Sequence, residues 1–442
     1  MGREAKARIK INQMLEESGW RFLDSDEGPA NIQLEQSVTL KKRDLVDMGE
    51  DFEKTRHGYI DFLLLDERGH PLLVLEAKRE DLNPLTGKEQ ARRYARSMNC
   101  RFVILSNGNI HYFWDLERGN PYIITRFPEP GSVTIYKVHT PRPKTLAEEN
   151  VGADYIALTQ RPGYSEEAGW KNEAEREAFI AANKLRFLRE YQVRAIQALQ
   201  QSAAEGHDRY LFEMATGTGK TLTAAAIIKL FLRTHNAHRV LFLVDRLELE
   251  AQAQRAFRDL LERDYKSVVY KEKRSEWRLA EIVVTTVQSL LFDNKYRRLF
   301  SPTDFDLVIS DEAHRSIGGN ARAVFEYFVG YKLGLTATPK DYLKKLDASQ
   351  RDPRELERRI LMDTYRTFGC ESGEPTFRYS LLDGVRDGFL VNPVVVDART
   401  EITAELLSKK GYAVLMQNEE GVEQEESFIE REIGRASCRE RG

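Results

Sequence analysis

The stretch YLFEMATGTGKTLTAAAIIKLFLR, Tyr210 to Arg233, decides the fold of the larger part of this 442-residue chain. Its first residues, 210 to 214, have the apolar character of a short strand. A turn with two glycines follows, and then an apolar helical pattern. After Lys184 the order of strand, glycine loop and helix repeats, which is typical of a parallel α/β domain. We therefore predict an α/β fold with a parallel sheet for this part of the chain.

The glycine turn predicts a site for the phosphates of ATP. Glycines let backbone N–H groups wrap around phosphates, and the following helix N-terminus favours negative charge. The turn is a short version of the P-loop, G-x-x-x-x-G-K-[ST], with Ala215 in place of the first glycine. Lys220 is expected to reach the β- and γ-phosphates, and Thr221 to place its hydroxyl on Mg²⁺. The predicted ATP-binding residues of this loop are Thr216, Gly217, Thr218, Gly219, Lys220 and Thr221.

An acidic pair supplies the complement of the loop. In FDLVISDEAHRS, Asp306 to Ser310 has the pattern of a buried strand, and Asp311 and Glu312 follow at its carboxyl end. Parallel sheets place their ligands at this end of the strands. Asp311 is expected to hold Mg²⁺, directly or through water, and Glu312 to orient or deprotonate the hydrolytic water. The alternative is an acidic pair that only caps a strand.

Further motifs between Leu188 and Pro339 resemble those of superfamily 2 helicases and translocases, and they occur in the family's order. The resemblance implies that Gln192, in LREYQVRAI, reads adenine. It also implies a first RecA-like lobe, and Asp363 to Val396 resembles the crossing into a second lobe, whose arginine finger does not follow. The residues that the resemblance implies in nucleic-acid contact or in coupling are Arg246, Thr285, Thr286, His314, Thr336 and Thr338.

A second site is predicted near LLVLEAKRED, Leu72 to Asp81. If residues 59 to 78 form a hairpin around Gly69, Asp61 lies opposite Glu76, and Lys78 shares the face of Glu76. Opposed side chains lie roughly 4.5–5.5 Å apart at Cβ, so the two carboxylates predict a divalent cation such as Mg²⁺ between them. Lys78 could then stabilise phosphoryl charge and orient a water. The alternative is an exposed hairpin with an incidental ion pair.

This arrangement resembles the PD-(D/E)xK nucleases. Gln90 and Tyr94, in EQARRYARS, resemble the QxxxY motif of a subset of them. Ile60 replaces the proline of the family's name. The family carries a further acidic residue on its first helix, and the sequence leaves three candidates open: Glu4, Glu16 and Glu17.

A nuclease followed by an ATP-driven motor resembles the restriction subunit, HsdR, of type I restriction–modification systems. The resemblance implies an ATP- and Mg²⁺-dependent endonuclease that translocates double-stranded DNA. The expected partners are methyltransferase and specificity subunits, and the expected location is the prokaryotic cytoplasm. Five alternatives stay open: a type III restriction subunit, a single-chain enzyme with a fused methyltransferase, a non-catalytic DNA-binding or scaffold protein, a DEAH-type RNA helicase, and another superfamily 2 DNA translocase with a nuclease domain. The nuclease position disfavours the first of these, and the intact sites disfavour the third.

The composition and the C-terminal residues further limit the function and the extent of the native chain. A net charge of −3 gives no global basic signature, so any DNA contact must be local. Three cysteines at wide spacing suit neither zinc nor a disulfide framework. EIGRASCRERG, at the end of the chain, resembles a translated sequencing adapter, so we expect a truncated protein with a foreign tail. The predicted domains are residues 1–140 (nuclease), 141–185 (linker), 186–370 (first motor lobe), 371–431 (start of the second lobe) and 432–442 (tail).

Overall fold

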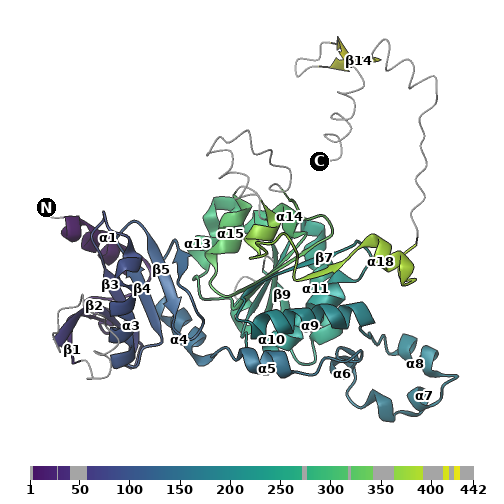
Figure 1. The fold of residues 1–442 in the computed structure, drawn as a ribbon, viewed down its shortest axis with the longest axis horizontal. Helices are drawn as coiled ribbons and strands as arrows, with labels where there is room; N and C mark the ends of the chain where they lie inside the picture. The colour runs from purple at the N-terminus through teal and green to yellow at the C-terminus, as the bar shows by residue number, and fades with distance from the viewer. Residues whose placement is uncertain are drawn as a thin grey trace. The chain divides into compact units, whose positions relative to one another are not determined.

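The computed structural model divides the chain into two units, Met1–Leu390 and Val391–Gly442 (Figure 1). It describes residues 3–26, 28–39, 57–270, 276–316, 320–341, 363–391, 412–417 and 423–428. Within the second unit, β14 (Tyr412–Gln417) pairs antiparallel with β15 (Glu423–Phe428). The predicted tail, and most of the predicted start of a second lobe, lie outside the described residues and stay predictions. Along the described ranges, no helix has the length and apolar character needed to cross a membrane.

The first module is a six-stranded mixed sheet that follows helix α1 (Arg3–Glu17). Its strands, in spatial order, are β1 (Ile32–Thr39), β2 (His57–Leu65), β3 (Pro71–Ala77), β4 (Phe102–Ser106), β5 (His111–Asp115) and β6 (Tyr122–Ile124). Only β3 and β4 are parallel, because the chain between them crosses over through η1 (Pro84–Gly87) and helix α3 (Lys88–Ser97). The hairpin predicted for residues 59 to 78 is thus confirmed, because β2 and β3 pair antiparallel.

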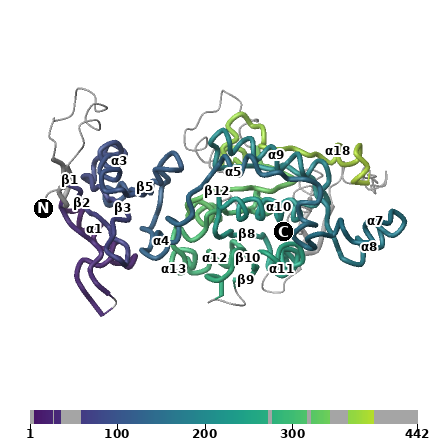
Figure 2. Tube along the Cα trace, turned by 90° about the horizontal axis from the view of Figure 1, so that it is seen from below, coloured from purple at the N-terminus to yellow at the C-terminus, as the bar shows by residue number. Residues whose placement is uncertain are grey.

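Helices α1 and α3 cover opposite faces of this sheet (Figure 2). Ile11 and Leu15 of α1 pack in one core with Phe62 and other residues of β2, β3 and β4. On the other face, Tyr94 of α3 packs in a second core with Leu63 of β2. Because successive strand residues point to opposite faces, β2 serves both cores at once. That explains why this part of the sequence reads as an almost continuous apolar run.

The segment predicted as a linker contains several short helices. They are α5 (Pro143–Glu148), α6 (Ala157–Gln160), η2 (Tyr164–Glu166), α7 (Ala168–Lys171) and α8 (Arg176–Ala182), after α4 (Pro130–Val138) of the first module. Leu146 of α5 and Ile156 are fully buried in the core of the second module. Gln200 of α9 donates hydrogen bonds to the backbone oxygens of Leu146 and Glu149, at 2.7 and 2.8 Å. The first part of the predicted linker, up to Ile156, therefore belongs to the second module, because its apolar side chains pack in the core of that module.

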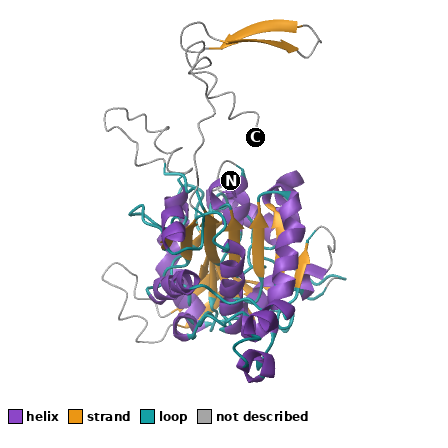
Figure 3. Ribbon diagram, turned by 90° about the vertical axis from the view of Figure 1, so that its right-hand side faces the viewer, coloured by secondary structure: helices purple, strands orange, loops and turns teal. Residues whose placement is uncertain are grey.

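The second module is a seven-stranded sheet in which every pair is parallel, with helices on both sides (Figure 3). Its strands, in spatial order, are β13 (Phe377–Tyr379), β7 (Arg209–Met214), β12 (Tyr331–Thr336), β11 (Leu307–Asp311), β8 (Val240–Val244), β10 (Ile282–Thr286) and β9 (Ser267–Val269). The longer helices on one face are α9 (Glu190–Ala204), α10 (Lys220–Arg233) and α11 (Leu247–Leu261). The short helices are η3 (Glu276–Leu279), α12 (Val287–Leu291), η4 (Phe292–Asn294), α13 (Lys295–Leu299), α14 (Ala313–Ser316), α15 (Ala321–Tyr327), α17 (Thr364–Thr367) and α18 (Leu381–Arg386).

Both faces of this sheet are buried. Phe242 of β8 lies in the core under α9, α10 and α11, whereas its neighbour Leu241 lies in the core under α12 and α15. A sheet covered on both faces needs apolar residues at consecutive positions, as in the VLFLV of β8. The fold is the predicted α/β class, with a RecA-like parallel sheet behind a nuclease-type module.

The sheet extends past residue 370, the predicted end of the first lobe. β13 pairs with β7 through Tyr379 and Met214, and the ring of Tyr379 stacks on Tyr191 at 3.9 Å between centroids. Phe368 is fully buried against Gly334 of β12. β13 is therefore the edge strand of this sheet, although it lies in the range 371–431 that was predicted to begin a second lobe.

Packing of Phe368 against β12 generates a prediction for stability. A Cβ added at Gly334 would lie 2.5 Å from Cζ of Phe368, and the ring has no room to move away. We expect Gly334→Ala to lower the free energy of unfolding by about 1–3 kcal/mol, measured by denaturant titration. Gly131→Ala is the control, because a Cβ at Gly131 meets nothing within 4 Å. Equal stability of Gly334→Ala and wild type would contradict this packing.

Candidate functional sites

The glycine loop lies between β7 and α10, at the carboxyl end of the sheet. Gly217 and Gly219 have φ angles of +84° and +75°, which L side chains rarely adopt. A Cβ at Gly219 would also lie 2.7 Å from Nε2 of Gln192. Both glycines are therefore required by backbone geometry.

Two side chains of α9 donate hydrogen bonds to the backbone of the glycine loop. Gln192 donates from Nε2 to the backbone oxygens of Thr218 and Gly219, at 3.1 and 3.2 Å. The hydroxyl of Tyr191 donates to the same oxygen of Thr218, at 2.7 Å. Gln192 was expected to read adenine, yet its side chain is buried here and its amide is engaged by the loop. Tyr191, which the sequence did not single out, has the same supporting position.

The residues of the glycine loop differ in their exposure to solvent. Thr216, Gly217 and Gly219 are exposed, and Lys220 and Thr221 are partly exposed. Thr218 is fully buried, and its hydroxyl donates to the backbone oxygen of Ala215 at 2.6 Å. The hydroxyl of Thr218 therefore closes the turn, and the role of Thr218 in ATP binding stays a prediction.

The acidic pair lies across from the loop, at the end of β11. Nζ of Lys220 lies 3.4 Å from Oε1 of Glu312. Burial, together with the nearby charge of Glu312, raises the pKa of Asp311. Glu312 has a φ of +49°, a strained conformation for a residue with a side chain, and its N–H donates to Oδ1 of Asp311 at 3.1 Å. The strained turn directs Glu312 toward the lysine of the loop.

The acidic pair is linked to the end of β12 through His314. Nδ1 of His314 lies 2.8 Å from Oγ1 of Thr336 and 3.5 Å from Oε2 of Glu312. Oγ1 of Thr336 also accepts from the N–H of Thr338, at 3.1 Å. The three residues predicted to couple hydrolysis to movement are thus in one chain of contacts that begins at Glu312.

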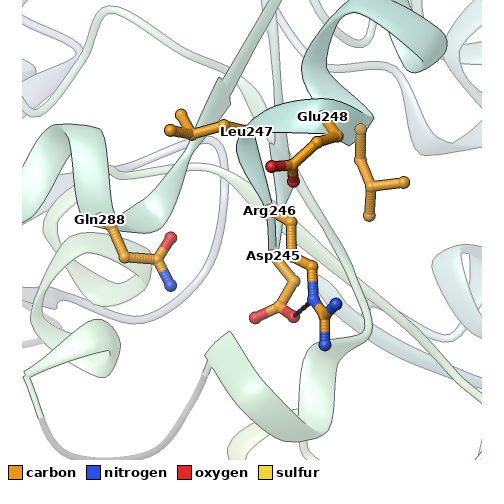
Figure 4. Close-up of a pocket in the computed structure, with 6 residues that line it drawn as sticks. Asp245, Arg246, Leu247, Glu248 and Gln288 are labelled. Atoms are coloured by element: carbon orange, nitrogen blue, oxygen red, sulfur yellow. Dashed lines mark ion pairs between the residues drawn. The ribbon is translucent and has the colours of Figure 1, made fainter. Parts of the chain in front are cut away.

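Arg246 lines a groove at the start of α11 (Figure 4). Arg246 is 63% exposed, at the first turn of α11, and lies 3.7 Å from Asp245, which also accepts from Arg315 at 2.7 Å. The pocket, of about 650 Å³, is lined by Asp245, Arg246, Leu247, Glu248, Leu249 and Gln288. Arg246 is accessible to a large ligand, as its predicted role requires.

Thr285 and Thr286 correct the sequence interpretation of the neighbouring loop. Both side chains are fully buried, because they end a central strand of the sheet. Thr286 caps α12 by accepting from the N–H of Ser289 at 3.1 Å. Neither side chain can contact DNA in this conformation, whereas Gln288, in the first turn of α12, is exposed.

The carboxylate pair lies in the first module, where β2 meets β3. Phe62 pairs with Leu75, which places Asp61 opposite Glu76 as the hairpin predicted. Oδ2 of Asp61 accepts from the N–H of Ala77 at 2.9 Å. The register therefore brings the two carboxyl groups to the same end of the sheet.

Glu76 is the buried member of the pair. Only 3% of the residue is exposed, and burial and the charge of Asp61 raise its pKa to about 7. Its Oε1 lies 2.9 Å from Nζ of Lys78, but its buried Oε2 has no hydrogen-bond partner. A divalent cation prefers such oxygen ligands, and it would satisfy this atom and relieve the repulsion from Asp61. Among the described residues, no group of three or more His, Cys, Asp or Glu side chains is placed to hold a metal, so the fit rests on these two carboxylates.

Gln90 and Tyr94 of α3 extend the network. Nζ of Lys78 lies 3.5 Å from Oε1 of Gln90, and Nε2 of Gln90 donates to the hydroxyl of Tyr94 at 3.2 Å. All five residues predicted for this site, Asp61, Glu76, Lys78, Gln90 and Tyr94, are thus brought together. A cross-strand pair and one helical turn are short-range relations, which is why the sequence predicted them.

The first helix was expected to carry a further acidic residue of the site, and that expectation stays a prediction. The side chain of this helix at the site is Arg8, whose Nη2 is paired with Oδ1 of Asp61. Glu16 and Glu17 are exposed near the other end of α1, about 12 Å further along the helix axis. The side chain of Glu4 lies outside the described residues. No signal in the sequence distinguishes Arg8 from Lys6 and Lys10 of the same helix.

Comparisons with known proteins match both modules. A family model described as the N terminus of the type I restriction enzyme R protein matches residues 32–128, and one described as the res subunit of type III restriction enzymes matches residues 186–341. The EcoAI endonuclease subunit of Escherichia coli is 26% identical over 389 residues, 85% of this chain and 42% of that protein. The EcoKI endonuclease subunit of Escherichia coli (strain K12) is 30% identical over 250 residues, 50% of this chain and 19% of that protein.

The chain is thus similar in sequence to type I restriction endonuclease subunits. Both modules are matched in the order that the sequence predicted, although the chain spans less than half the length of these two relatives. Among solved structures, the Hef helicase domain of Pyrococcus furiosus shares 26% identity over 42% of this chain and 37% of that one. Its TM-score of 0.32 is too low to support an argument.

The buried carboxyl of Glu76 makes the stability of the fold depend on pH. Its pKa rises from an ordinary value of 4.5 to about 7 in the fold. Between these values the unfolded chain loses the proton while the folded chain keeps it, so stability falls as pH rises and the full cost is present above about pH 7. We expect Glu76→Gln, in EDTA, to raise the free energy of unfolding at pH 8 by up to about 3 kcal/mol, with no gain at pH 4.

Denaturant titrations at the two pH values measure this effect. Glu67→Gln is the matched control, because Glu67 is exposed in the turn between β2 and β3. A Glu76→Gln variant less stable than wild type at pH 8 would show that the carboxylate is ionised at little cost.

Proposed function

We propose that this chain is part of an ATP-dependent type I restriction endonuclease subunit, which translocates duplex DNA with a superfamily 2 motor and cuts it with a Mg²⁺-dependent nuclease. The observation that supports it is the presence of two constellations of polar side chains in one unit. One joins Lys220, Glu312 and His314 at the carboxyl end of a parallel sheet. The other joins Glu76 and Lys78, with Asp61 opposite.

In the motor, the glycine loop would bind the phosphates of ATP through its backbone N–H groups. Lys220 would move from Glu312 to the β- and γ-phosphates, which frees the carboxylate to orient the attacking water. Thr221 and Asp311 would hold Mg²⁺, which neutralises phosphate charge. His314, Thr336 and Thr338 then connect the state of Glu312 to the end of β12.

In the nuclease, Asp61 and Glu76 would hold Mg²⁺, which supplies a Lewis acid for phosphodiester hydrolysis. Lys78 would orient the attacking water and stabilise charge on the phosphate, while Gln90 and Tyr94 keep the ammonium in position. The water oxygen bonds to phosphorus, and the bond from phosphorus to the leaving sugar oxygen breaks. The water gives up a proton to solvent, and the leaving oxygen takes one up.

The proposed partners are double-stranded DNA and the methyltransferase and specificity subunits of the system, in a prokaryotic cytoplasm. A specificity subunit would read the target sequence, so a motor needs only contacts to the DNA backbone. Arg246 is the accessible predicted contact. Such local contacts agree with the absence of a basic net charge.

The test uses the full-length gene product with its two partner subunits. Unmethylated circular plasmid that carries a target is mixed with Mg²⁺ and ATP. Linear DNA that requires ATP, and is absent with methylated plasmid, supports the proposal. DNA-stimulated ATPase without cutting would overturn the nuclease assignment and favour a remodelling translocase.

Removal of the loop lysine isolates the motor. Lys220→Ala should lower DNA-stimulated ATP hydrolysis by at least about 100-fold, because the β- and γ-phosphates lose their side-chain cation. ATP hydrolysis by the assembled complex is the measurement. Arg233→Ala is the control, since Arg233 lies exposed at the far end of the same helix. Retained hydrolysis in Lys220→Ala would contradict the phosphate assignment.

Removal of the second lysine isolates the nuclease. Lys78→Ala should abolish plasmid cutting and leave ATP hydrolysis unchanged, because the two sites lie in different modules. Arg79→Ala is the matched control, since Arg79 is the next residue and pairs with Asp81 at the surface. Cutting that persists in Lys78→Ala would place the nuclease elsewhere in the complex.

A further inference from the structure

Helix α1 is held against the first sheet at a fixed depth. Ala7, Ile11 and Leu15 are fully buried, and their spacing of four residues forms one face of the helix. A Cβ added at Gly108 would lie 3.0 Å from Cα of Ala7, so the backbone of the helix nearly touches the turn after β4. The position of the Cα and Cβ atoms of Arg8, the next residue, is therefore fixed by the packing of the helix.

Lys10 fixes the rotation of the same helix. Its Nζ lies 2.6 Å from Oε1 of Glu80 and donates to Oδ1 of Asn109 at 2.7 Å. One of these partners follows β3 and the other follows β4. Arg8, two residues earlier, is thus held at the edge of the carboxylate site by contacts that do not involve Arg8 itself.

Arg8 faces two carboxylates of neighbouring strands. Its Nη2 is paired with Asp61, and its Nη1 lies 3.4 Å from Oε1 of Glu35. Glu35 lies between two β1 residues that pair with β2, Leu34 with Phe62 and Gln36 with Ile60, and its φ of +50° marks a local irregularity in the strand. With 31% of its side-chain surface exposed, Arg8 is accessible from solvent.

The charges of the site indicate what Arg8 does. Asp61, Glu76 and Glu35 bring three negative charges when ionised, and Lys78 and Arg8 bring two positive charges from opposite ends of the Asp61–Glu76 pair. A divalent cation would therefore leave the site with one net positive charge. The transition state of phosphodiester hydrolysis concentrates two negative charges on the oxygens around phosphorus. Preorganised cations at that position lower its energy.

We propose that Arg8 is a substrate-binding residue of the nuclease site, which holds a non-bridging oxygen of the phosphodiester being cut. The inference rests on the proposed nuclease function. Without DNA and metal, the guanidinium balances the charge of Asp61. When a metal ion takes over that carboxylate, Arg8 turns to the phosphate, on the side of the site opposite Lys78. Arg8 makes no covalent bond and moves no proton.

A purely structural role predicts a different outcome. If Arg8 only braced Asp61, its removal would loosen the carboxylate and weaken both metal binding and cutting. If Arg8 binds phosphate and competes with the metal ion for Asp61, its removal lowers cutting but makes metal binding tighter. The two roles thus move metal affinity in opposite directions.

The experiment compares Arg8→Ala and Arg8→Lys with wild type in the full-length chain. Mn²⁺ affinity is measured by calorimetry without DNA, and single-turnover cutting and DNA-stimulated ATPase are measured with the partner subunits. We expect Arg8→Ala to cut about 100-fold more slowly, with unchanged ATPase. Its Mn²⁺ dissociation constant should fall roughly three- to tenfold, because one positive charge has left the site. Arg8→Lys should recover part of the cutting rate.

Lys6→Ala is the matched control, since Lys6 is exposed on the same helix and its loss removes the same charge from α1. It should leave Mn²⁺ affinity and cutting near wild type. Arg8→Ala that cuts like wild type, or that binds Mn²⁺ more weakly, overturns the proposal. If the wild-type complex cuts no DNA, the proposed function fails, and an Mn²⁺ affinity unchanged by Arg8→Ala then overturns this assignment as well.

Discussion

Parallel pairing of the motor strands is the constraint on which the larger module depends. β7, β12 and β11 are adjacent and in register, so residues that follow these strands emerge at one edge of the sheet. That edge brings Lys220 to Glu312, and His314 to Thr336, although these pairs are far apart in the sequence. The buried faces of the sheet make the arrangement rigid, because a register slip would expose apolar side chains on both sides.

The smaller module solves a different electrostatic problem. Burial of Glu76 beside Asp61 is unfavourable, and the fold offsets it with Lys78 on one side and Arg8 on the other. Each cation comes from a different element, since Lys78 follows β3 and Arg8 is on α1. Without a metal ion the two carboxylates repel each other. The charges of Lys78 and Arg8 offset enough of this repulsion for the module to fold.

Contacts within the first unit join the two modules near the start of the motor strands. The hydroxyl of Tyr122 donates to Asp208, just before β7, and the buried guanidinium of Arg118 lies between the rings of Tyr136 and Tyr331. Tyr331 begins β12, whose other end is Thr336. A strand thus runs from the module boundary to Thr336, which contacts His314.

The sequence by itself determined the parallel α/β fold, the glycine loop, the acidic pair and the register that opposes Asp61 and Glu76. These depend on local spacing: two residues along a strand, four along a helix, or one tight hairpin. Tertiary structure alone decided that Gln192 supports the loop, that Thr285 and Thr286 are buried, that β13 pairs with β7, and that α1 supplies Arg8. Each of these depends on which distant element packs against the residue. Such a contact cannot be inferred from local sequence spacing, because it exists only once the whole chain has folded.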